Sequence, residues 1–272
     1  MQSLFYTDDG PRDAPVVLLV HGITSSHKAW AGVARNLPHH RVIAVDLRGR
    51  GASQLGAPYG LEQHATDLIA VLDELDIDRA TVAGHSMGAF VAVVLAHLHP
   101  KRVTNLLLVD GGIPLELPDG VGLEQAFGPT ADRLTMEFAT REAYREFWAR
   151  HPSLVDDWGP DVAAFADYDL VERDGVLRSR TSADAMRTDA AELYDSELVV
   201  AALDRLRPTT LLTAPRGLLD DAALYAPATL AKWADRVPML EVMEVPDVNH
   251  YTIIMGARGA ATVAAAIRAA GR

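Results

Sequence analysis

The chain has 272 residues, a length that fits one large domain or two small ones. Hydrophobic residues make up 49% and charged residues 23%, which excludes a disordered or fibrous chain. The net charge of −12 argues against nucleic-acid and membrane-surface roles, because such a surface repels phosphate and anionic lipid. The absence of cysteine excludes disulfides, thiolate nucleophiles and cysteine-bound metals.

Nothing in the sequence indicates a membrane or an export signal. The first twelve residues lack the basic stretch and apolar segment of a signal peptide. The longest fully apolar run, residues 89–96, is far shorter than the roughly 20 residues that span a bilayer. We therefore expect a cytoplasmic monomer or homodimer that acts on a small molecule, without a nucleic-acid or membrane partner.

Short apolar runs, rich in leucine or β-branched residues, recur through the N-terminal half, at residues 16–20, 42–45, 81–83 and 106–109. Continuous runs of this kind are typical of strands buried on both faces of a parallel sheet. Helical patterns lie between these runs. Residues 61–75 carry their apolar side chains on one face, whereas residues 87–99 are apolar nearly all round. This alternation predicts an α/β protein with right-handed crossovers.

The alternation stops after Asp110 and resumes with a strand candidate at 209–213, a helix at 226–235, a strand at 240–245 and a helix from about 251 to 270. The stretch between, residues 113–206, has helical patterns at 141–150 and 183–206 and holds nine of the 17 aromatic residues. We predict that residues 1–112 and 207–272 form one core domain and that residues 113–206 form an inserted helical lid, or cap.

Gly84-His85-Ser86-Met87-Gly88 lies between the strand at 81–83 and the helix that follows. This is a G-x-S-x-G pattern in the strand-to-helix context that a nucleophilic serine requires. The flanking glycines are needed because side chains there would clash with the neighbouring helix and strand. The helix N-terminus favours negative charge nearby. The pattern predicts Ser86 as a nucleophile; the alternative is a tight turn with a surface serine.

Two further motifs supply partners for Ser86. His21-Gly22-Ile23 closes the first strand and would place the N–H of Ile23, with that of Met87, in a two-donor oxyanion hole. His250 follows the last strand, and a neutral imidazole is the natural acceptor of a serine proton near pH 7.

The other histidines are given no catalytic role. We expect His21 and His85 to pack beside their motifs, and His64, among others on helices and loops, to be a surface or satisfied histidine. No histidine pair has the spacing of metal ligands, so no metal is predicted.

Together these motifs resemble the α/β-hydrolase superfamily over nearly the whole chain. The resemblance includes the stretch Asp46-Leu47-Arg48-Gly49-Arg50-Gly51-Ala52-Ser53, in which Arg50 stands where the family usually has histidine. We interpret that stretch as a glycine-rich loop that shapes the wall of the site. The resemblance implies a mostly parallel twisted sheet with helices on both faces, an inserted helical lid, a Ser-His-Asp triad and no cofactor.

The acid of the triad has two candidates. In the superfamily it most often follows the seventh strand, but here Asp220 and Asp221 come about three residues later than usual. Some branches, such as haloalkane dehalogenases and certain lactone hydrolases, carry the acid after the sixth strand, where Asp110 stands at the tip of the run 106–109. We favour Asp110, keep Asp221 as the alternative acid, and note that Asp110 also suits a helix or turn cap.

The predicted reaction is hydrolysis of a carboxylic ester or lactone through an acyl-enzyme. The aromatic residues of the lid suggest a small to medium apolar substrate. A serine nucleophile disfavours epoxide hydrolase and dehalogenase chemistry. Carbon–carbon bond hydrolysis, perhydrolase or thioesterase activity on the same triad remain alternatives, as does a ligand-binding receptor with vestigial turnover.

Overall fold

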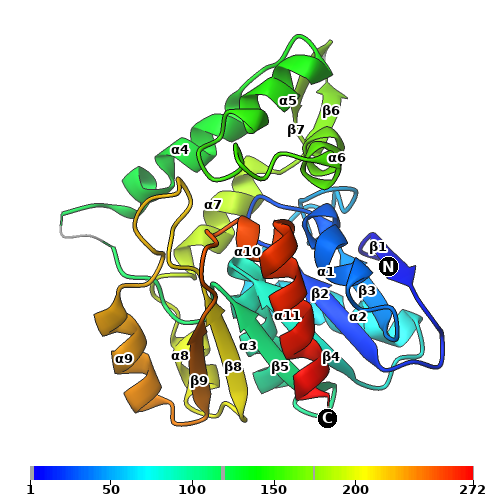
Figure 1. Ribbon diagram of the computed structural model, residues 1–272, viewed down its shortest axis with the longest axis vertical. Helices are drawn as coiled ribbons and strands as arrows, with labels where there is room; N and C mark the ends of the chain where they lie inside the picture. Colours follow the sequence, from blue (N-terminus) through cyan, green and yellow to red (C-terminus); the bar gives the residue numbers. More distant parts are fainter. Residues whose placement is uncertain (1–2, 118–119, 174, 272) are drawn as a thin grey trace.

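The computed structural model describes residues 3–117, 120–173 and 175–271. Its central sheet has seven strands in the order β1-β3-β2-β4-β5-β8-β9 (Figure 1). Only β1 is antiparallel to its neighbour, and the other neighbouring pairs are parallel. The strands are β1 (Tyr6–Asp9), β2 (Val16–Val20), β3 (Arg41–Val45), β4 (Ala80–His85), β5 (Val103–Val109), β8 (Thr209–Thr213) and β9 (Leu240–Glu244). The predicted mostly parallel α/β sheet is confirmed.

Helices cover both faces of this sheet. Within β2, Leu18 and Val20 belong to one apolar cluster, whereas Val17 and Leu19 belong to the other. The first cluster includes residues of α2 (Leu61–Glu74), α3 (Met87–Leu98), α8 (Glu197–Leu203) and α9 (Pro227–Arg236). The second includes residues of η1 (His27–Trp30), α1 (Ala31–Arg35), α10 (Thr252–Met255) and α11 (Ala257–Ala270). Burial on both faces explains why the strands are continuous apolar runs.

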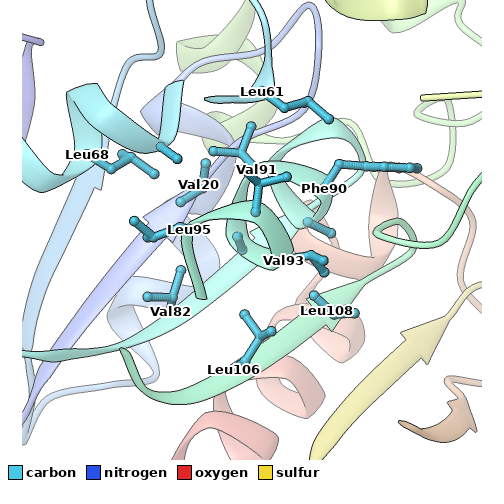
Figure 2. Packing of buried hydrophobic residues seen from close by; sticks show 14 of the residues in the cluster. Val20, Leu61, Leu68, Val82, Phe90, Val91, Val93, Leu95, Leu106 and Leu108 are labelled. Carbon is cyan, nitrogen blue, oxygen red and sulfur yellow. The ribbon is translucent and has the colours of Figure 1, made fainter. Parts of the chain in front are cut away.

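The helix α3 is the centre of the first cluster. Figure 2 shows Phe90, Val91, Val93 and Leu95 of this helix among side chains of the sheet and of α2. Every residue of α3 from Met87 to Leu95 is buried, which explains the helix's nearly all-round apolar sequence. Because α3 is fixed on so many sides, the residue that precedes it, Ser86, has a rigid support.

The segment between β5 and β8 contains α4 (Leu123–Thr135), α5 (Arg141–Ala149), α6 (Pro160–Asp169), β6 (Leu170–Arg173), β7 (Val176–Ser179) and α7 (Ala183–Ala191). These elements lie together at one end of the sheet (Figure 1). Strands β6 and β7 form an antiparallel hairpin separate from the central sheet. The sequence predicted helix throughout this segment; strands of four residues are too short to show an alternating pattern.

Two predicted helices are each divided. The range 183–206 forms α7 and α8, because Ser196 caps a new helix by accepting a hydrogen bond from the N–H of Val199. The range 251–270 forms α10 and α11, with extended backbone at Gly256 between them. Helix α8 packs against α3 within the first cluster. In the described ranges, no helix has the length and apolar character needed to cross a membrane.

Candidate active site

Ser86 sits in a strained turn between β4 and α3. Its φ of 54° and ψ of −127° lie outside the usual regions for an L-residue. A Cβ on Gly84 would lie 2.1 Å from the carbonyl oxygen of Gly88, and a Cβ on Gly88 would lie 2.1 Å from that of Val20. The structure thus confirms that both glycines are required by close approach of the helix and the neighbouring strand.

His250 and Asp110 are hydrogen-bonded and buried. The Nδ1 atom of His250 lies 2.7 Å from Oδ2 of Asp110, and the two side chains are 5% and 1% exposed. An ionised carboxylate only accepts hydrogen bonds, so Nδ1 carries the proton and Nε2 is left as an acceptor. The other carboxylate oxygen, Oδ1, accepts from the N–H of Ala214 at 3.1 Å. Asp110 has a φ of 44° just beyond β5, and its N–H donates to the carbonyl of Leu212.

The carboxylates after β8 have other partners. Asp220 accepts hydrogen bonds from Nδ2 of Asn249 at 2.8 Å and from Nη1 of Arg216 at 2.7 Å. Asp221 accepts from the N–H of Leu219 at 3.4 Å, within its own loop. Of the candidate acids, Asp110 is therefore the one whose carboxylate the fold brings to His250.

Ser86 and His250 line the same cavity, which has a volume of about 110 Å³. Most of its wall is apolar and includes Phe90, Leu115, Phe127, Leu193, Leu224 and Met255. Phe127 comes from α4, and Leu193 and Tyr194 follow α7, so the segment between β5 and β8 supplies one side of the cavity. Among the described residues, no lysine, arginine, aspartate or glutamate lines it.

The peptide that carries the Ile23 N–H lies against Ser86. A Cβ on Gly22 would be only 3.1 Å from the Cβ of Ser86. The carbonyl oxygen of Gly22 is 2.7 Å from Nδ1 of His21, and Nε2 of His21 accepts from the N–H of Leu47 at 2.9 Å. These partners fix His21 as the Nδ1–H tautomer. Burial lowers its pKa to about 4, so this imidazole is neutral near pH 7.

Met87, the other predicted oxyanion donor, opens α3, where the backbone N–H has no partner within the helix. Its side chain is fully buried. The helix N-terminus therefore directs a donor toward the turn that holds Ser86.

His85 has a larger part in the site than the packing role predicted for it. Its Nε2 lies 2.8 Å from the carbonyl oxygen of His250, and the two ring centroids are 4.7 Å apart. Burial holds the pKa of His85 well below its usual range, so the neutral ring donates Nε2–H to that carbonyl. The sequence offered one indication of this role, because His85 lies directly before Ser86 at the end of β4.

His64 takes the second of the two roles expected for it, that of a buried histidine with a hydrogen-bond partner. It is fully buried, and its Nε2 lies 2.9 Å from Oδ2 of Asp189, which belongs to α7. In the part of the chain that the structure describes, no three histidine, aspartate or glutamate side chains converge as a metal site requires.

A family model for the alpha/beta hydrolase fold matches residues 15–257. The chain belongs to this family. It is 36% identical over 217 residues to Lipase LipV of Mycobacterium tuberculosis, which covers 72% of this chain and 82% of the lipase. It is 30% identical over 239 residues to 2-(acetamidomethylene)succinate hydrolase of Mesorhizobium japonicum, which covers 87% of this chain and 82% of that enzyme.

Solved structures agree with this assignment. A crystal structure of E-2-(acetamidomethylene)succinate hydrolase superposes with a TM-score of 0.81 at 25% identity, covering 98% of this chain and 94% of the other. A thioesterase domain from the curacin biosynthetic pathway superposes with a TM-score of 0.74 at 23% identity, covering 97% and 94%, and shows the fold alone. Hydrolase activity is thus supported, whereas these relatives differ in the substrates that their names give.

Proposed function

We propose that this protein is a serine hydrolase that cleaves a carboxylic ester or lactone with a small, neutral, apolar acyl group. The observation that carries the proposal is the buried His250–Asp110 hydrogen bond beside Ser86, with Ser86 and His250 lining one cavity. A nucleophile, a base and a carboxylate that orients the base are the three parts that acyl transfer requires.

In the proposed mechanism, Ser86 Oγ attacks the ester carbonyl while His250 Nε2 takes the hydroxyl proton. Asp110 stabilises the imidazolium, and the N–H groups of Ile23 and Met87 bind the oxyanion. The tetrahedral intermediate collapses as His250 gives the proton to the leaving alkoxide, which departs as an alcohol from an ester and stays on the acyl chain as a hydroxyl group when the substrate is a lactone. His250 then takes a proton from a water molecule, which attacks the acyl-enzyme. The carboxylic acid leaves as His250 returns a proton to Ser86.

The cavity supports a short acyl group. An apolar cavity of about 150 Å³ accepts benzene, so the volume of about 110 Å³ here fits an acyl chain of only a few carbons. We infer that residues 113–206 act as a lid, since Phe127, Leu193 and Tyr194 from this segment line the cavity. Helices α7 and α8 at its end are fixed to the core, by Asp189 and by packing against α3, so longer substrates require the part of the lid before α7 to move.

The cavity wall also favours a neutral substrate. The name of the succinate hydrolase relative indicates a substrate with carboxylates. A buried carboxylate needs a cationic partner, and no lysine or arginine among the described residues lines this cavity. An ester of an uncharged acid meets no such requirement.

The test combines labelling of the serine with hydrolysis of p-nitrophenyl esters and lactones of graded size. We expect a fluorophosphonate to label the wild type stoichiometrically. Ser86→Ala should remain unlabelled and lose turnover by a factor on the order of 10⁶.

The matched control is Ser26→Ala, because the Ser26 hydroxyl is buried and has no hydrogen-bond partner among the described residues. It should label and turn over like the wild type. Ser86→Ala activity within tenfold of the wild type would refute the nucleophile. A wild type that neither labels nor hydrolyses any ester would instead indicate a receptor.

A further inference from the structure

Arg50 is fully buried, and its guanidinium contacts three oxygen atoms. Its Nε donates to the carbonyl oxygen of Ile23 at 2.9 Å, and its Nη1 donates to that of Arg48 at 2.9 Å. Nη1 also lies 2.5 Å from Oδ2 of Asp189, and both side chains of this ion pair are 0% exposed. A planar guanidinium offers several donors in a fixed fork, which suits simultaneous contact with groups on different segments.

Asp189 is satisfied from three sides. Besides Arg50, it accepts from Nε2 of His64 at 2.9 Å and from the N–H of Gly60 at 2.7 Å. Asp189 belongs to α7 between β5 and β8, whereas Arg50, Gly60 and His64 belong to the N-terminal core. A buried charge is tolerated only when it is paired, so Arg50 and Asp189 hold these two parts of the chain in one arrangement.

The backbone of Ile23 is held on both sides of its Cα. On the N-terminal side, His21 binds the carbonyl of Gly22, in the peptide that carries the Ile23 N–H. On the C-terminal side, Arg50 binds the carbonyl of Ile23 itself. Nη2 of Arg50 also lies 3.9 Å from Sδ of Met87. Arg50 therefore contacts both residues whose N–H groups form the proposed oxyanion hole.

We propose that Arg50, paired with Asp189, is a positioning residue that fixes the Ile23 donor of the oxyanion hole. The inference rests on the proposed hydrolase function. It assigns a role to α7 as well, because the carboxylate that holds Arg50 comes from this helix. Catalysis then requires α7 to be seated on the core, although Asp189 touches no reacting atom.

The test measures kcat, KM and inhibition by an alkyl boronic acid, whose tetrahedral adduct with a serine occupies the oxyanion hole. For Arg50→Lys and Asp189→Asn we expect kcat to fall at least tenfold and the boronic acid to bind at least tenfold more weakly. KM should stay within about threefold. Removal of a whole oxyanion donor lowers kcat by a factor of about 10²–10³, and this is the largest loss of kcat that we expect for these variants.

A matched control lies in the same loop. The Arg48 side chain donates to both carboxylate oxygens of Asp67, at 2.8 and 2.6 Å, and within the described part of the chain it makes no hydrogen bond to Ile23. Arg48→Lys should keep the kcat and the boronic acid affinity of the wild type. A loss of kcat in this control equal to that of Arg50→Lys would overturn the proposal, because any disturbance of the loop would then suffice.

A second variant separates positioning from folding. Arg50→Met combined with Asp189→Leu removes both buried charges, a change that folded proteins often tolerate. It also removes the donor to Ile23, so kcat should stay at least tenfold below the wild type. Wild-type kcat in this double variant, or in a folded Arg50→Lys, would overturn the inference while leaving the proposed function intact. A wild type without hydrolysis or fluorophosphonate labelling would instead remove the proposed function.

Discussion

The side-chain amide of Asn249 donates to Oδ1 of Asp220 at 2.8 Å and to the carbonyl oxygen of Ser153 at 3.0 Å. Its own oxygen accepts from the N–H groups of Tyr251 and Thr252. Asn249 precedes His250 and is buried. One amide thus joins the loop after β8, a segment beyond α5, and the turn that presents His250.

Removal of that amide should affect both stability and turnover. For Asn249→Ala we expect the free energy of unfolding to fall by about 2–4 kcal/mol, because several buried groups lose their partner at about 1–3 kcal/mol each. We expect kcat to fall at least tenfold as His250 loses its support. Urea unfolding and ester hydrolysis measure the two effects. Asn105→Ala, which removes one long 3.3 Å hydrogen bond to Thr81, is the control and should change neither by much.

The acid can be identified by isosteric substitution. Asp110→Asn places a donor where the imidazole Nδ1–H needs an acceptor, which favours the wrong tautomer; the same change in a serine protease costs about 10⁴ in turnover. We expect at least a hundredfold loss of kcat for Asp110→Asn and less than tenfold for Asp221→Asn. The opposite order would assign the acid to the loop after β8.

Stability should depend on pH through His21. Its pKa is about 4 in the folded protein and 6.5 without burial, so between these values the unfolded chain binds more protons. Folding stability therefore falls as the pH falls through this window. From pH 7.5 to 5.0, the wild type should lose about 2 kcal/mol more than His21→Asn in urea unfolding. If His21→Asn and the wild type lost the same free energy of unfolding over this pH range, the prediction would be contradicted.

Acyl chain length should reveal the size of the cavity. We expect p-nitrophenyl acetate and butyrate to be hydrolysed at least tenfold faster than the octanoate, as judged by kcat/KM, because the cavity holds about 110 Å³. Leu193→Ala removes atoms from its wall and should shift the preference toward longer chains. A wild-type optimum at the octanoate or beyond would show that the substrate site is much larger than this cavity.

The fold could be predicted because strands buried on both faces of a sheet have uninterrupted apolar sequences. Val16–Val20 is apolar without interruption for that reason, and Ser86, Asp110 and His250 each follow a strand. The choice between Asp110 and Asp221 could not be made from strand ends alone. It depends on the left-handed backbone at Asp110 and on the contact of the Asp221 carboxylate with the N–H of Leu219 in its own loop, neither of which has a local pattern.

Other features were not predictable for related reasons. The hairpin β6–β7 is too short to show periodicity, and the division between α7 and α8 depends on the single cap at Ser196. The pairing of Arg50 with Asp189 joins residues far apart in the chain, and one sequence does not show which acid among many meets a given arginine.

The buried ion pair between Arg50 and Asp189 limits how this protein can be re-engineered. A segment borrowed from another α/β hydrolase to replace residues 113–206 must bring a carboxylate to the place of Asp189. Without it, the chimera would bury an arginine with no counter-ion, and Arg50 would have to be exchanged in the same step. Positions 50 and 189 must therefore be exchanged together. The segment 113–206 cannot be replaced on its own as a way to alter the substrate range.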